Sequence, residues 1–470
     1  ITLTEEIDYP LLHKLITESN SQEEDLIELH NYKKNFNNLD NKLPYVKVTY
    51  YQKLDQDGVP IGRFYALGVP NCLTRMKRNL RNILIKNIYQ DIDIENCAPS
   101  ILYNICVINN IDCSILKEYV KNRKSKINQL NTELSINNES IVKQLIIQLT
   151  YGGSDTRDNL FLENYKKEIK DITNKLKQIN SYKRYLNYVK DNNENIDGKF
   201  LSCLIYDFEN KILMEAYSYF INNNFTVGTF EFDGLKVKKN TIDGSKVVNR
   251  NLTEITKIIK EKLNFQIKFV IKNIIIDEEY KIILKELKNR YIINNDVEGR
   301  DIMASLYKDK FIFTQPKVCF VNTNNIWEEK KERETILNSL ITFTNNEDIR
   351  KVAKISKNEE TGEKQVITKQ YSKESGGSKS LAGLWISTLS HNCYKNKNFN
   401  DLMYSSTIGK ICFEDGVYDF RKRKFVSWKN CHNVFSQYKI NCKYKDVEKI
   451  DDKYVNKVKS KIMEACLKPN

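Results

Sequence analysis

The spacing of apolar and polar residues along the chain predicts a mixture of helices and strands. Apolar positions that recur every three or four residues are typical of a helix with one buried face, and alternation is typical of a strand. We therefore expect strands over residues 46–53 and 265–276, and a strand leading into a helix over 88–107. Helices are predicted over residues 1–45 (one or two), 74–90, 115–150, 160–192, 200–222 and 247–263.

Two segments are defined by their turn residues. Residues 225–232 and 235–239 alternate in polarity on either side of Asp233-Gly234, a dipeptide that is the strongest short-range signal for a hairpin. This hairpin would present the carboxylate of Asp233 beyond the ends of its strands. The stretch 355–380 is polar and contains many Gly, Ser and Glu residues, so we expect a flexible loop there.

The length of the chain, 470 residues, exceeds that of one compact domain. With 40% hydrophobic and 11% aromatic residues, it has enough apolar surface to bury real cores. We predict an α+β protein with a helical N-terminal segment (1–45), a larger domain (46–276), a helical connector (277–300) and a smaller α+β domain (301–470).

The net charge of +14 indicates a polyanionic partner if the lysines cluster. Solvated lysines encoded by an AT-rich genome are an equally simple interpretation, since Asn, Ile and Lys are all abundant. The 11 cysteines form no CxxC pair, which argues against zinc and favours reduced thiols inside a cell. No apolar run approaches the roughly 20 residues that span a bilayer, so no membrane is expected. Because the chain begins with Ile1, we expect a piece of a longer protein.

Two aspartates in separate segments have a spacing and context that suit metal binding. Residues 91–102 end a strand at Asp93 and begin a helix near Pro99, a residue that fits the first turn of a helix. Asp233 lies at the tip of the predicted hairpin. Two aspartates brought together from separate strands suit two magnesium ions, which prefer hard oxygen ligands.

A third segment supplies groups suited to a nucleotide. Lys143, Ile147 and Tyr151 recur every four residues, so one face of a helix presents all three. Gly152 and Gly153 follow at the end of that helix. A lysine offers a cation for phosphate groups, and an aromatic ring offers a flat surface for a base.

In this order the three segments resemble motifs A, B and C of family A DNA polymerases. The eight-residue step from Lys143 to Tyr151 matches that family's fingers helix, and Gly62-Arg63-Phe64-Tyr65 is similar to its primer-gripping element. The sequence most resembles the divergent branch of virophages and related mobile elements, in which the polymerase is fused to a superfamily 3 helicase. The resemblance implies a right-hand palm and fingers followed by a smaller α+β domain.

The resemblance also implies residue roles. Asp93 and Asp233 would be the catalytic residues and would bind two magnesium ions, with manganese as a substitute. The nucleotide site for deoxynucleoside triphosphates would consist of Lys143, Ile147, Tyr151 and Gly152. The DNA primer-template would contact Arg63. The sequence adds further candidates for contacts with DNA phosphates, namely Arg78, Arg81 and the lysines of residues 160–192, a stretch predicted to be polar on most faces and either solvated or aligned with nucleic acid.

Several positions depart from the family pattern. Ala98 stands where this branch usually has histidine and ordinary family A enzymes have glutamate, which leaves sugar selection open. Phe232 and Gly234 replace the usual neighbours of the second aspartate, and Ile147 replaces a common aromatic residue. Asp91 is an alternative to Asp93.

Taken singly, each segment has a purely structural interpretation. Asp233-Gly234 is an ordinary hairpin signal, Tyr151-Gly152 an ordinary helix end, and Asp93 an ordinary helix cap. Two further functions stay open, a non-catalytic nucleic-acid-binding module of a replicative helicase and a primase that starts chains unaided.

The C-terminal third resembles the region that precedes the ATPase in poxvirus-type primase-helicases of superfamily 3. The resemblance rests on residues 300–345 and 408–428. No GxxxxGK[ST] loop is present, because Ser378 stands where the last glycine of that motif belongs. We expect the helicase motor, and any oligomer formed through it, to lie in the missing part of a viral protein that acts at a replication site inside a host cell.

Overall fold

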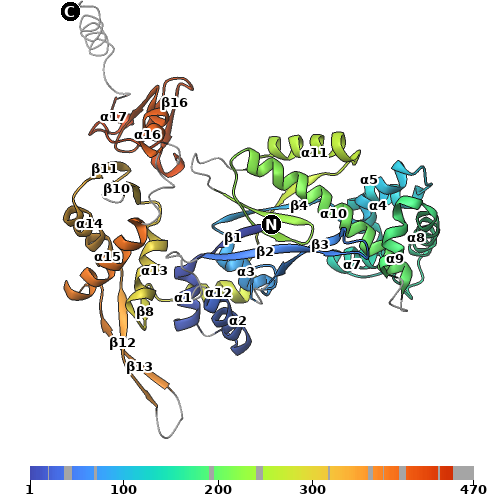
Figure 1. Ribbon diagram of the computed structural model, residues 1–470, viewed down its shortest axis with the longest axis horizontal. Helices are drawn as coiled ribbons and strands as arrows, with labels where there is room; N and C mark the ends of the chain where they lie inside the picture. The colour runs from blue at the N-terminus through green and yellow to red at the C-terminus, as the bar shows by residue number, and fades with distance from the viewer. Residues whose placement is uncertain are drawn as a thin grey trace, which may run out of the picture.

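The chain folds into a mixed α/β structure of helices and several small sheets (Figure 1). In Figure 1 two of the sheets form a central body, a helical lobe extends to one side, and the C-terminal elements lie on the other with the remaining sheets. The computed structural model describes residues 1–19, 21–35, 45–67, 71–189, 195–239, 247–315, 318–357, 364–373, 375–390, 398–431 and 434–447.

A four-stranded antiparallel sheet lies in the central body, with strand order β5-β6-β4-β7. Its strands are β4 (Tyr89–Ile94), β5 (Val227–Glu231), β6 (Gly234–Lys238) and β7 (Phe269–Lys272). Helices occupy the connections from β4 to β5 and from β6 to β7, so the chain follows a β-α-β-β-α-β path. Side chains alternate across the sheet, which buries Ile92, Leu235 and Val237 on one face and places Asp91 and Asp93 on the other.

The N-terminal segment begins with a strand rather than with the predicted helix. The three strands β1 (Thr2–Glu6), β2 (Tyr45–Leu54) and β3 (Pro60–Leu67) form an antiparallel sheet. β1 alternates buried and exposed residues, and its pairing with β2 supplies the partner that a sequence pattern cannot reveal. The predicted helices follow as α1 (Tyr9–Glu18) and α2 (Glu23–Lys34).

The two central sheets are tied together by a buried hydroxyl contact. β1 lies beside β5, and the hydroxyls of Tyr50 and Thr229 are 2.6 Å apart. Phe230 of β5 lies edge-on to the Tyr50 ring, with ring centres 5.1 Å apart. The hairpin of β5 and β6 therefore rests on the N-terminal sheet.

Helices after β4 build the helical lobe, whereas the helix before β4 lies in the central body (Figure 1). The helix predicted over residues 74–90 is shorter, because the chain enters β4 at Tyr89. The helices of this part of the chain are α3 (Arg78–Ile85), α4 (Cys97–Ile108), α5 (Ser114–Lys121), α6 (Arg123–Glu133), α7 (Glu139–Thr150), α8 (Leu160–Gln178), α9 (Lys183–Val189) and α10 (Ile196–Asn222). The long helix α10 runs from the lobe back to the sheet (Figure 1).

The lysine-rich stretch 160–192 was predicted to be polar on most faces, and this prediction is wrong for α8. Leu162, Tyr165, Ile169 and Leu176 are buried along one side of this helix. Three- and four-residue steps separate most of its buried residues, so the lysines occupy only the outer face.

Most of the remaining elements belong to the C-terminal part, and their strands form sheets separate from the central ones. They are α11 (Asn249–Leu263), α12 (Glu278–Glu286), β8 (Tyr291–Ile293), α13 (Asp296–Leu306), β9 (Phe311–Gln315), β10 (Val318–Thr323), β11 (Ile326–Lys330), α14 (Arg333–Asn345), β12 (Ile349–Lys357), β13 (Lys364–Gln370), α15 (Ser375–Ser390), α16 (Phe399–Thr407), β14 (Lys410–Cys412), β15 (Gly416–Asp419), β16 (Lys424–Ser427) and α17 (Tyr444–Val447). The strand predicted over residues 265–276 is confirmed only as β7, because Phe265 and Ile267 are buried without joining the sheet.

Two predictions for the C-terminal part are corrected. The connector 277–300 is not wholly helical, because β8 pairs with β12 between α12 and α13. The predicted loop 355–380 contains the end of β12, all of β13 and the start of the helix α15, in which Leu381 and Trp385 are completely buried. This packing outweighs the weak helix propensity of the preceding Gly and Ser residues.

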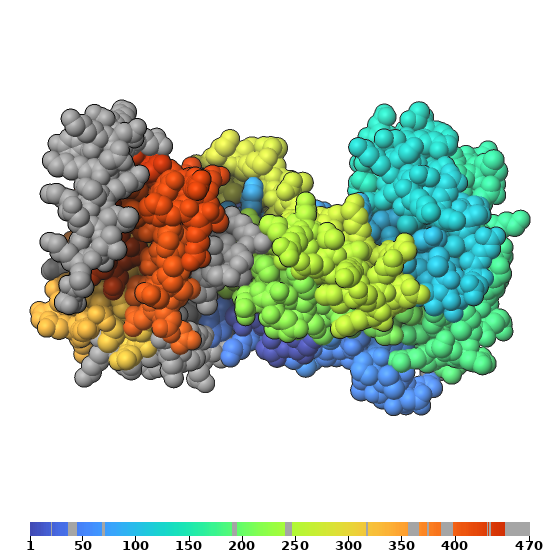
Figure 2. Space-filling model, turned by 90° about the horizontal axis from the view of Figure 1, so that it is seen from above, coloured from blue at the N-terminus to red at the C-terminus, as the bar shows by residue number. Residues whose placement is uncertain are grey.

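Figure 2 shows a hollow between the helical lobe and the central body, along the upper edge of the view. Within the described ranges, no helix is both long and apolar enough to cross a bilayer.

Candidate functional site

The two predicted metal-binding aspartates lie on neighbouring strands. Asp93 is opposite Gly234 in the register of β4 and β6, and the N–H of Ile94 donates to the carbonyl of Asp233 at 3.2 Å. The Asp93 side chain is buried, whereas Asp233 is half-buried in the turn between β5 and β6. The structure therefore brings both residues to one end of the sheet.

The turn itself differs from the predicted one. Glu231 pairs with Gly234, so the turn residues are Phe232 and Asp233 rather than Asp233 and Gly234. Phe232 takes the left-handed conformation, with φ at 49°. Gly234 lies in the strand, where a Cβ would be 2.9 Å from Oδ1 of Asp93 and 2.9 Å from the carbonyl of Ile92. Glycine is needed at this position because the Asp93 carboxylate occupies the space of a side chain.

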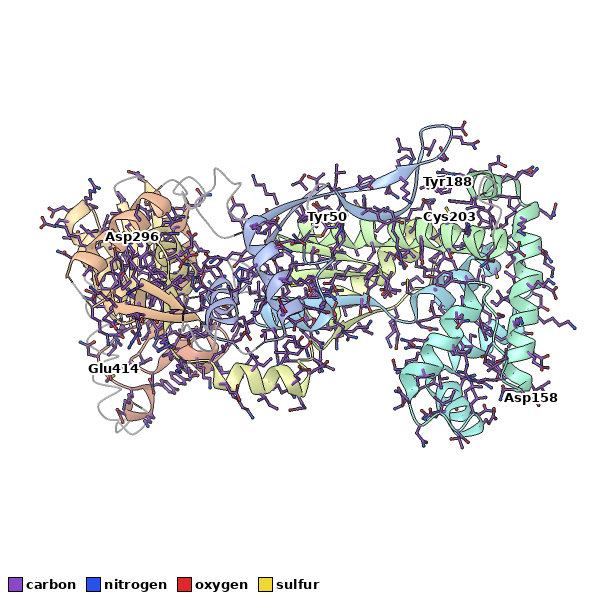
Figure 3. The ribbon with its side chains drawn as sticks, turned by 90° about the horizontal axis from the view of Figure 1, so that it is seen from below. Tyr50, Asp158, Tyr188, Cys203, Asp296 and Glu414 are labelled. Atoms are coloured by element: carbon purple, nitrogen blue, oxygen red, sulfur yellow. The ribbon has the colours of Figure 1, made fainter. Side chains whose placement is uncertain are left out.

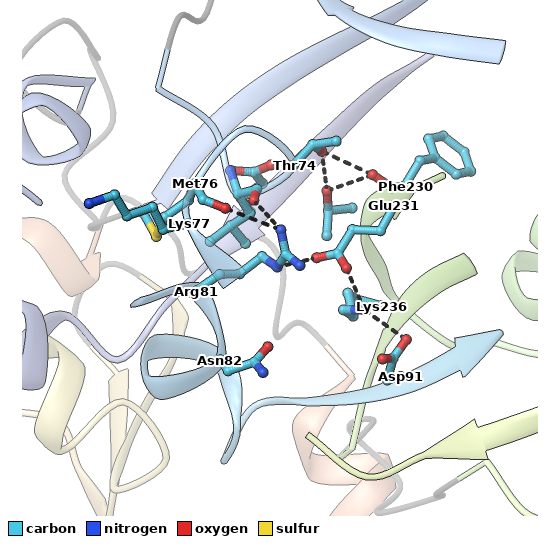
Figure 4. A network of polar contacts seen from close by, with 12 residues as sticks. Thr74, Met76, Lys77, Arg81, Asn82, Asp91, Phe230, Glu231 and Lys236 are labelled. Carbon is cyan, nitrogen blue, oxygen red and sulfur yellow. Dashed lines mark hydrogen bonds and ion pairs between the residues drawn. The ribbon is translucent and has the colours of Figure 1, made fainter. Parts of the chain in front are cut away.

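Lysines on the same face of the sheet neutralise the carboxylates. The ammonium of Lys272 on β7 contacts Oδ2 of Asp93. The ammonium of Lys236 on β6 lies 2.7 Å from Oδ1 of Asp91 and 2.7 Å from Oε2 of Glu231 (Figure 4). Lys236 is only 3% exposed, so this pairing removes what would otherwise be an isolated buried charge.

Arg81 completes this network from α3. Its Nε lies 2.7 Å from Oε1 of Glu231, and its Nη1 donates to the carbonyls of Leu73 and Met76 at 3.2 and 3.3 Å (Figure 4). Arg81 was predicted to contact DNA, but the structure places its guanidinium in the interior, where it holds Glu231. Arg78 is exposed one turn earlier.

Arg63 joins the hairpin turn to α10. Its guanidinium binds both carboxylate oxygens of Glu209, with distances of 2.5 Å from Nε to Oε1 and 2.7 Å from Nη2 to Oε2. The same group lies 3.6 Å from the ring centre of Tyr206 and 5.6 Å from that of Phe232. Arg63 therefore couples the primer-gripping segment predicted from the sequence to the turn that carries Asp233.

Burial and neighbouring charges shift the pKa values of two carboxylates at this end of the sheet. Burial raises the pKa of Asp233, and the neighbouring Asp91 raises it further, while Arg63 and Lys236 lower it. Burial likewise raises the pKa of Glu209, although Arg63 opposes this effect. A positive ion between the carboxylates would offset the unfavourable burial of their charges.

The carboxylates also have the chemistry that magnesium requires. The Lys272 ammonium lies against Oδ2 of Asp93, so a cation already compensates this buried carboxylate. No three Asp, Glu, His or Cys side chains of the described residues are grouped as a metal site. Asp93 and Asp233 nevertheless offer hard oxygen ligands of the kind that magnesium prefers.

The predicted nucleotide-binding residues differ in how far their side chains are buried. Tyr151 caps α7, and its ring centre is 5.7 Å from that of Tyr206, in an edge-to-face arrangement. Gly152 follows with φ at 74°, as a helix end requires. Lys143 and Ile147 lie on the exposed surface of α7, and the Lys143 ammonium is 2.9 Å from Oε2 of Glu139. Only Tyr151 is linked to the aspartates, through Tyr206 and Arg63.

A cavity of about 710 Å³ opens beside these aromatic residues, between β2, β3 and the ends of α7, α9 and α10. Figure 3 shows Tyr188 and Cys203, which line it, at the end where the β2–β3 hairpin meets the helical lobe. Its lining includes Lys53, Tyr65, Tyr151, Tyr188, Lys199 and Tyr206. Rings and lysines in one cavity are suited to the bases and phosphates of a nucleic-acid strand.

Sequence reasoning missed Tyr206, Glu209 and Lys236. The signal for Glu209 was present, because Asp207 and Glu209 are two carboxylates within an apolar helix, and such residues need a buried partner. Lys236 had no such signal, since its contacts with Asp91 and Glu231 depend on strand register.

Comparisons with known proteins find similarity to a virophage sequence and to solved structures. A Sputnik virophage protein described as "Putative helicase V13" is 25% identical over 485 residues, which cover 96% of this chain and 57% of that protein. The chain thus spans little more than half the length of this relative. The POL domain of Pol1 from M. smegmatis, in complex with DNA primer-template and dNTP, has a TM-score of 0.34 at 12% identity, covering 53% of this chain and 51% of that one. No protein-family model matches the sequence.

The contact between Gly234 and Asp93 generates a first prediction. Gly234→Ala should lower the free energy of unfolding by about 1–3 kcal/mol, because the new methyl group must displace the Asp93 carboxylate or the β4 backbone. Urea unfolding measures the change. Gly383→Ala in α15 is the matched control, since a Cβ there has no heavy atom within 4 Å. Equal stabilities of the two variants would contradict the close packing of β4 and β6.

Proposed function

We propose that this chain is a DNA-directed nucleotidyltransferase, a DNA polymerase of the family A type, within a viral replication protein. The observation that carries the proposal is the position of Asp93 and Asp233 at one end of two adjacent strands. These residues belong to segments that occur in the order of polymerase motifs A and C, with Lys143 and Tyr151 between them.

In this proposal the sheet β5-β6-β4-β7 is the palm, and helices α4 to α9 contain the fingers. Asp93 and Asp233 would hold two magnesium ions, with manganese as a substitute. When bound, such ions activate the 3′ hydroxyl of a primer and bind the triphosphate of the incoming nucleotide. The chain contributes rigid positions for the two carboxylates, because Gly234 lets β6 approach Asp93 closely and Arg63 supports the adjoining turn.

The nucleotide would lie between the sheet and α7. We assign the base pair to Tyr151, with Gly152 ending the helix beside it, and the triphosphate to Lys143 with Ile147 on the same face. The ion pair between Lys143 and Glu139 does not oppose this role. A solvent-exposed pair with i,i+4 spacing is worth only about 0.3–0.5 kcal/mol, so a triphosphate would displace Glu139 easily.

The primer-template would occupy the hollow between the helical lobe and the central body. Arg63 and the exposed Arg78 are suited to contact its backbone, together with the lysines on the outer face of α8 and in the cavity beside Tyr151. We assign Arg81 a supporting role, because it holds Glu231 and through it Lys236. Binding through these cations would weaken steeply as salt increases.

The C-terminal third would serve a longer replication protein. The virophage relative is described as a putative helicase, and the match covers 57% of its length. We propose that residues 301–470 precede a superfamily 3 motor, that oligomers form through that motor, and that the protein acts at a viral replication site in a host cell. Within the chain, 46–276 would form the polymerase domain and 277–300 the connector.

A second function, a non-catalytic nucleic-acid-binding module, is favoured by one observation. The Lys272 ammonium contacts Asp93, an arrangement that would also stabilise an aspartate with no metal to bind. Primer extension separates the two functions, because a binding module incorporates no nucleotides at any magnesium or manganese concentration.

The catalytic assignment predicts that Asp93→Asn and Asp233→Asn each abolish nucleotide incorporation without unfolding the protein. Each substitution removes a charge that metal ions require and keeps the shape of the side chain. Single-nucleotide primer extension and circular dichroism measure activity and folding. Asp158→Asn is the matched control, because Asp158 is exposed far from the sheet, in the helical lobe (Figure 3), and should leave activity unchanged. Near-normal extension by both active-site variants would refute the assignment.

The triphosphate assignment predicts that Lys143→Ala raises the KM for the nucleotide and lowers kcat. The lysine would contribute to binding in the ground state and to charge stabilisation in the transition state. Steady-state incorporation kinetics measure both constants. Lys257→Ala is the matched control, since Lys257 also pairs with a glutamate four residues away on an exposed helix. If both variants kept the kinetics of the unmodified chain, Lys143 would be an ordinary surface residue.

A further inference from the structure

The turn between β15 and β16 carries a dense cluster of positive charge. Its residues Arg421, Lys422, Arg423 and Lys424, here called the basic turn, are all exposed. None of them forms an ion pair with any other described residue. Many other lysines and arginines of this chain do have a carboxylate partner, so the basic turn is an unusually open concentration of charge.

Hydrogen bonds to Asp419 fix the shape of the basic turn. Oδ1 of the buried Asp419 accepts the N–H groups of Arg421 and Lys422 at 2.9 and 3.2 Å. Arg423 takes the left-handed conformation, with φ at 48°, and Lys424 pairs with Asp419 across the strands. The Asp419 carboxylate therefore binds backbone N–H groups, and the four cationic side chains are held around a tight bend.

An aromatic ring lies at the entrance of the basic turn. Phe420 is 54% exposed, and its ring stands edge-on to Tyr418 with ring centres 5.1 Å apart. The N–H of Phe420 donates to the carbonyl of Gly409 at 3.0 Å, so the residue is anchored by its backbone while the ring stays open. An exposed ring next to cations offers a stacking surface beside phosphate-binding groups.

A groove with two further exposed rings adjoins the same sheet. It has a volume of about 400 Å³, and Tyr404 and Tyr438 at its edge are 74% and 82% exposed. The groove is connected to the basic turn through Lys410, which pairs with Asp419 and donates to the carbonyl of Ser406 on α16 at 2.6 Å.

We propose that the basic turn and Phe420 bind a single-stranded nucleic acid. Cations track its backbone, and the exposed rings stack with unpaired bases, which duplex DNA would not offer. This surface belongs to the C-terminal elements, which Figure 1 places on the opposite side of the central body from the helical lobe. It would hold a strand outside the polymerase site, and it does not depend on catalysis at Asp93 and Asp233.

A tryptophan at position 420 gives a local test in the full chain. Phe420→Trp keeps a large ring at an exposed position, and stacking of thymine on indole quenches its fluorescence. We expect titration with the oligonucleotide dT20 to produce a saturable quench beyond that of the unsubstituted chain. Adding Arg421→Ala, Lys422→Ala and Lys424→Ala should raise the apparent Kd roughly 10-fold and reduce the log–log salt slope by about 2.

The matched control carries Phe420→Trp with Lys257→Ala, Lys260→Ala and Lys281→Ala, which removes the same charge from exposed sites on α11 and α12. It should keep the quench, affinity and salt slope of the reporter. The proposal is overturned by the absence of a specific quench, by equal losses in both triple variants, or by stronger binding to duplex DNA. It is also overturned if phosphatidylserine vesicles produce the quench and dT20 does not.

Discussion

The close approach of β4 and β6 is the constraint on which the rest of the proposed site depends. Asp93 fits only because the facing residue, Gly234, has no side chain, and this pairing sets Asp233 in the adjoining turn. In this turn a non-glycine residue, Phe232, takes a left-handed conformation. Strand pairing and the contact of its ring with Arg63 help to maintain that conformation. One register thus determines the positions of both carboxylates.

This strand register brings several carboxylates close together, so their negative charges repel one another. The surrounding cations offset this repulsion. Lys236 bridges Asp91 and Glu231, Arg81 binds Glu231 from α3, and Arg63 binds Glu209 from β3. Removing one partner from a buried ion pair typically costs about 3–5 kcal/mol, since the other charge is left without compensation. These pairs therefore connect the sheet, α3 and α10 into one unit around the aspartates.

The sequence was informative where a pattern is local. Alternation located β2, β4 and the β5–β6 hairpin, and the motif order placed Asp93, Tyr151 and Asp233 in segments that the fold joins. It was misleading where tertiary packing decides, as in β1, which needs β2 as a partner, and in α15, which is stabilised by burial of Trp385. The Asp233-Gly234 pair was identified as a turn although Gly234 is required by a neighbouring strand. Cross-strand partners such as Lys236 cannot be found before the register is known.

Direct observation of metal ions would test the proposed site most sharply. Crystals of the chain with a primer-template, a non-hydrolysable nucleotide and manganese would yield anomalous difference maps that locate the ions without assumptions. We expect manganese between the carboxylates of Asp93 and Asp233, with Lys272 moved away from Asp93 and the triphosphate facing Lys143. Manganese bound elsewhere, with Lys272 still against Asp93 while the nucleotide is present, would contradict a polymerase site at this end of the sheet.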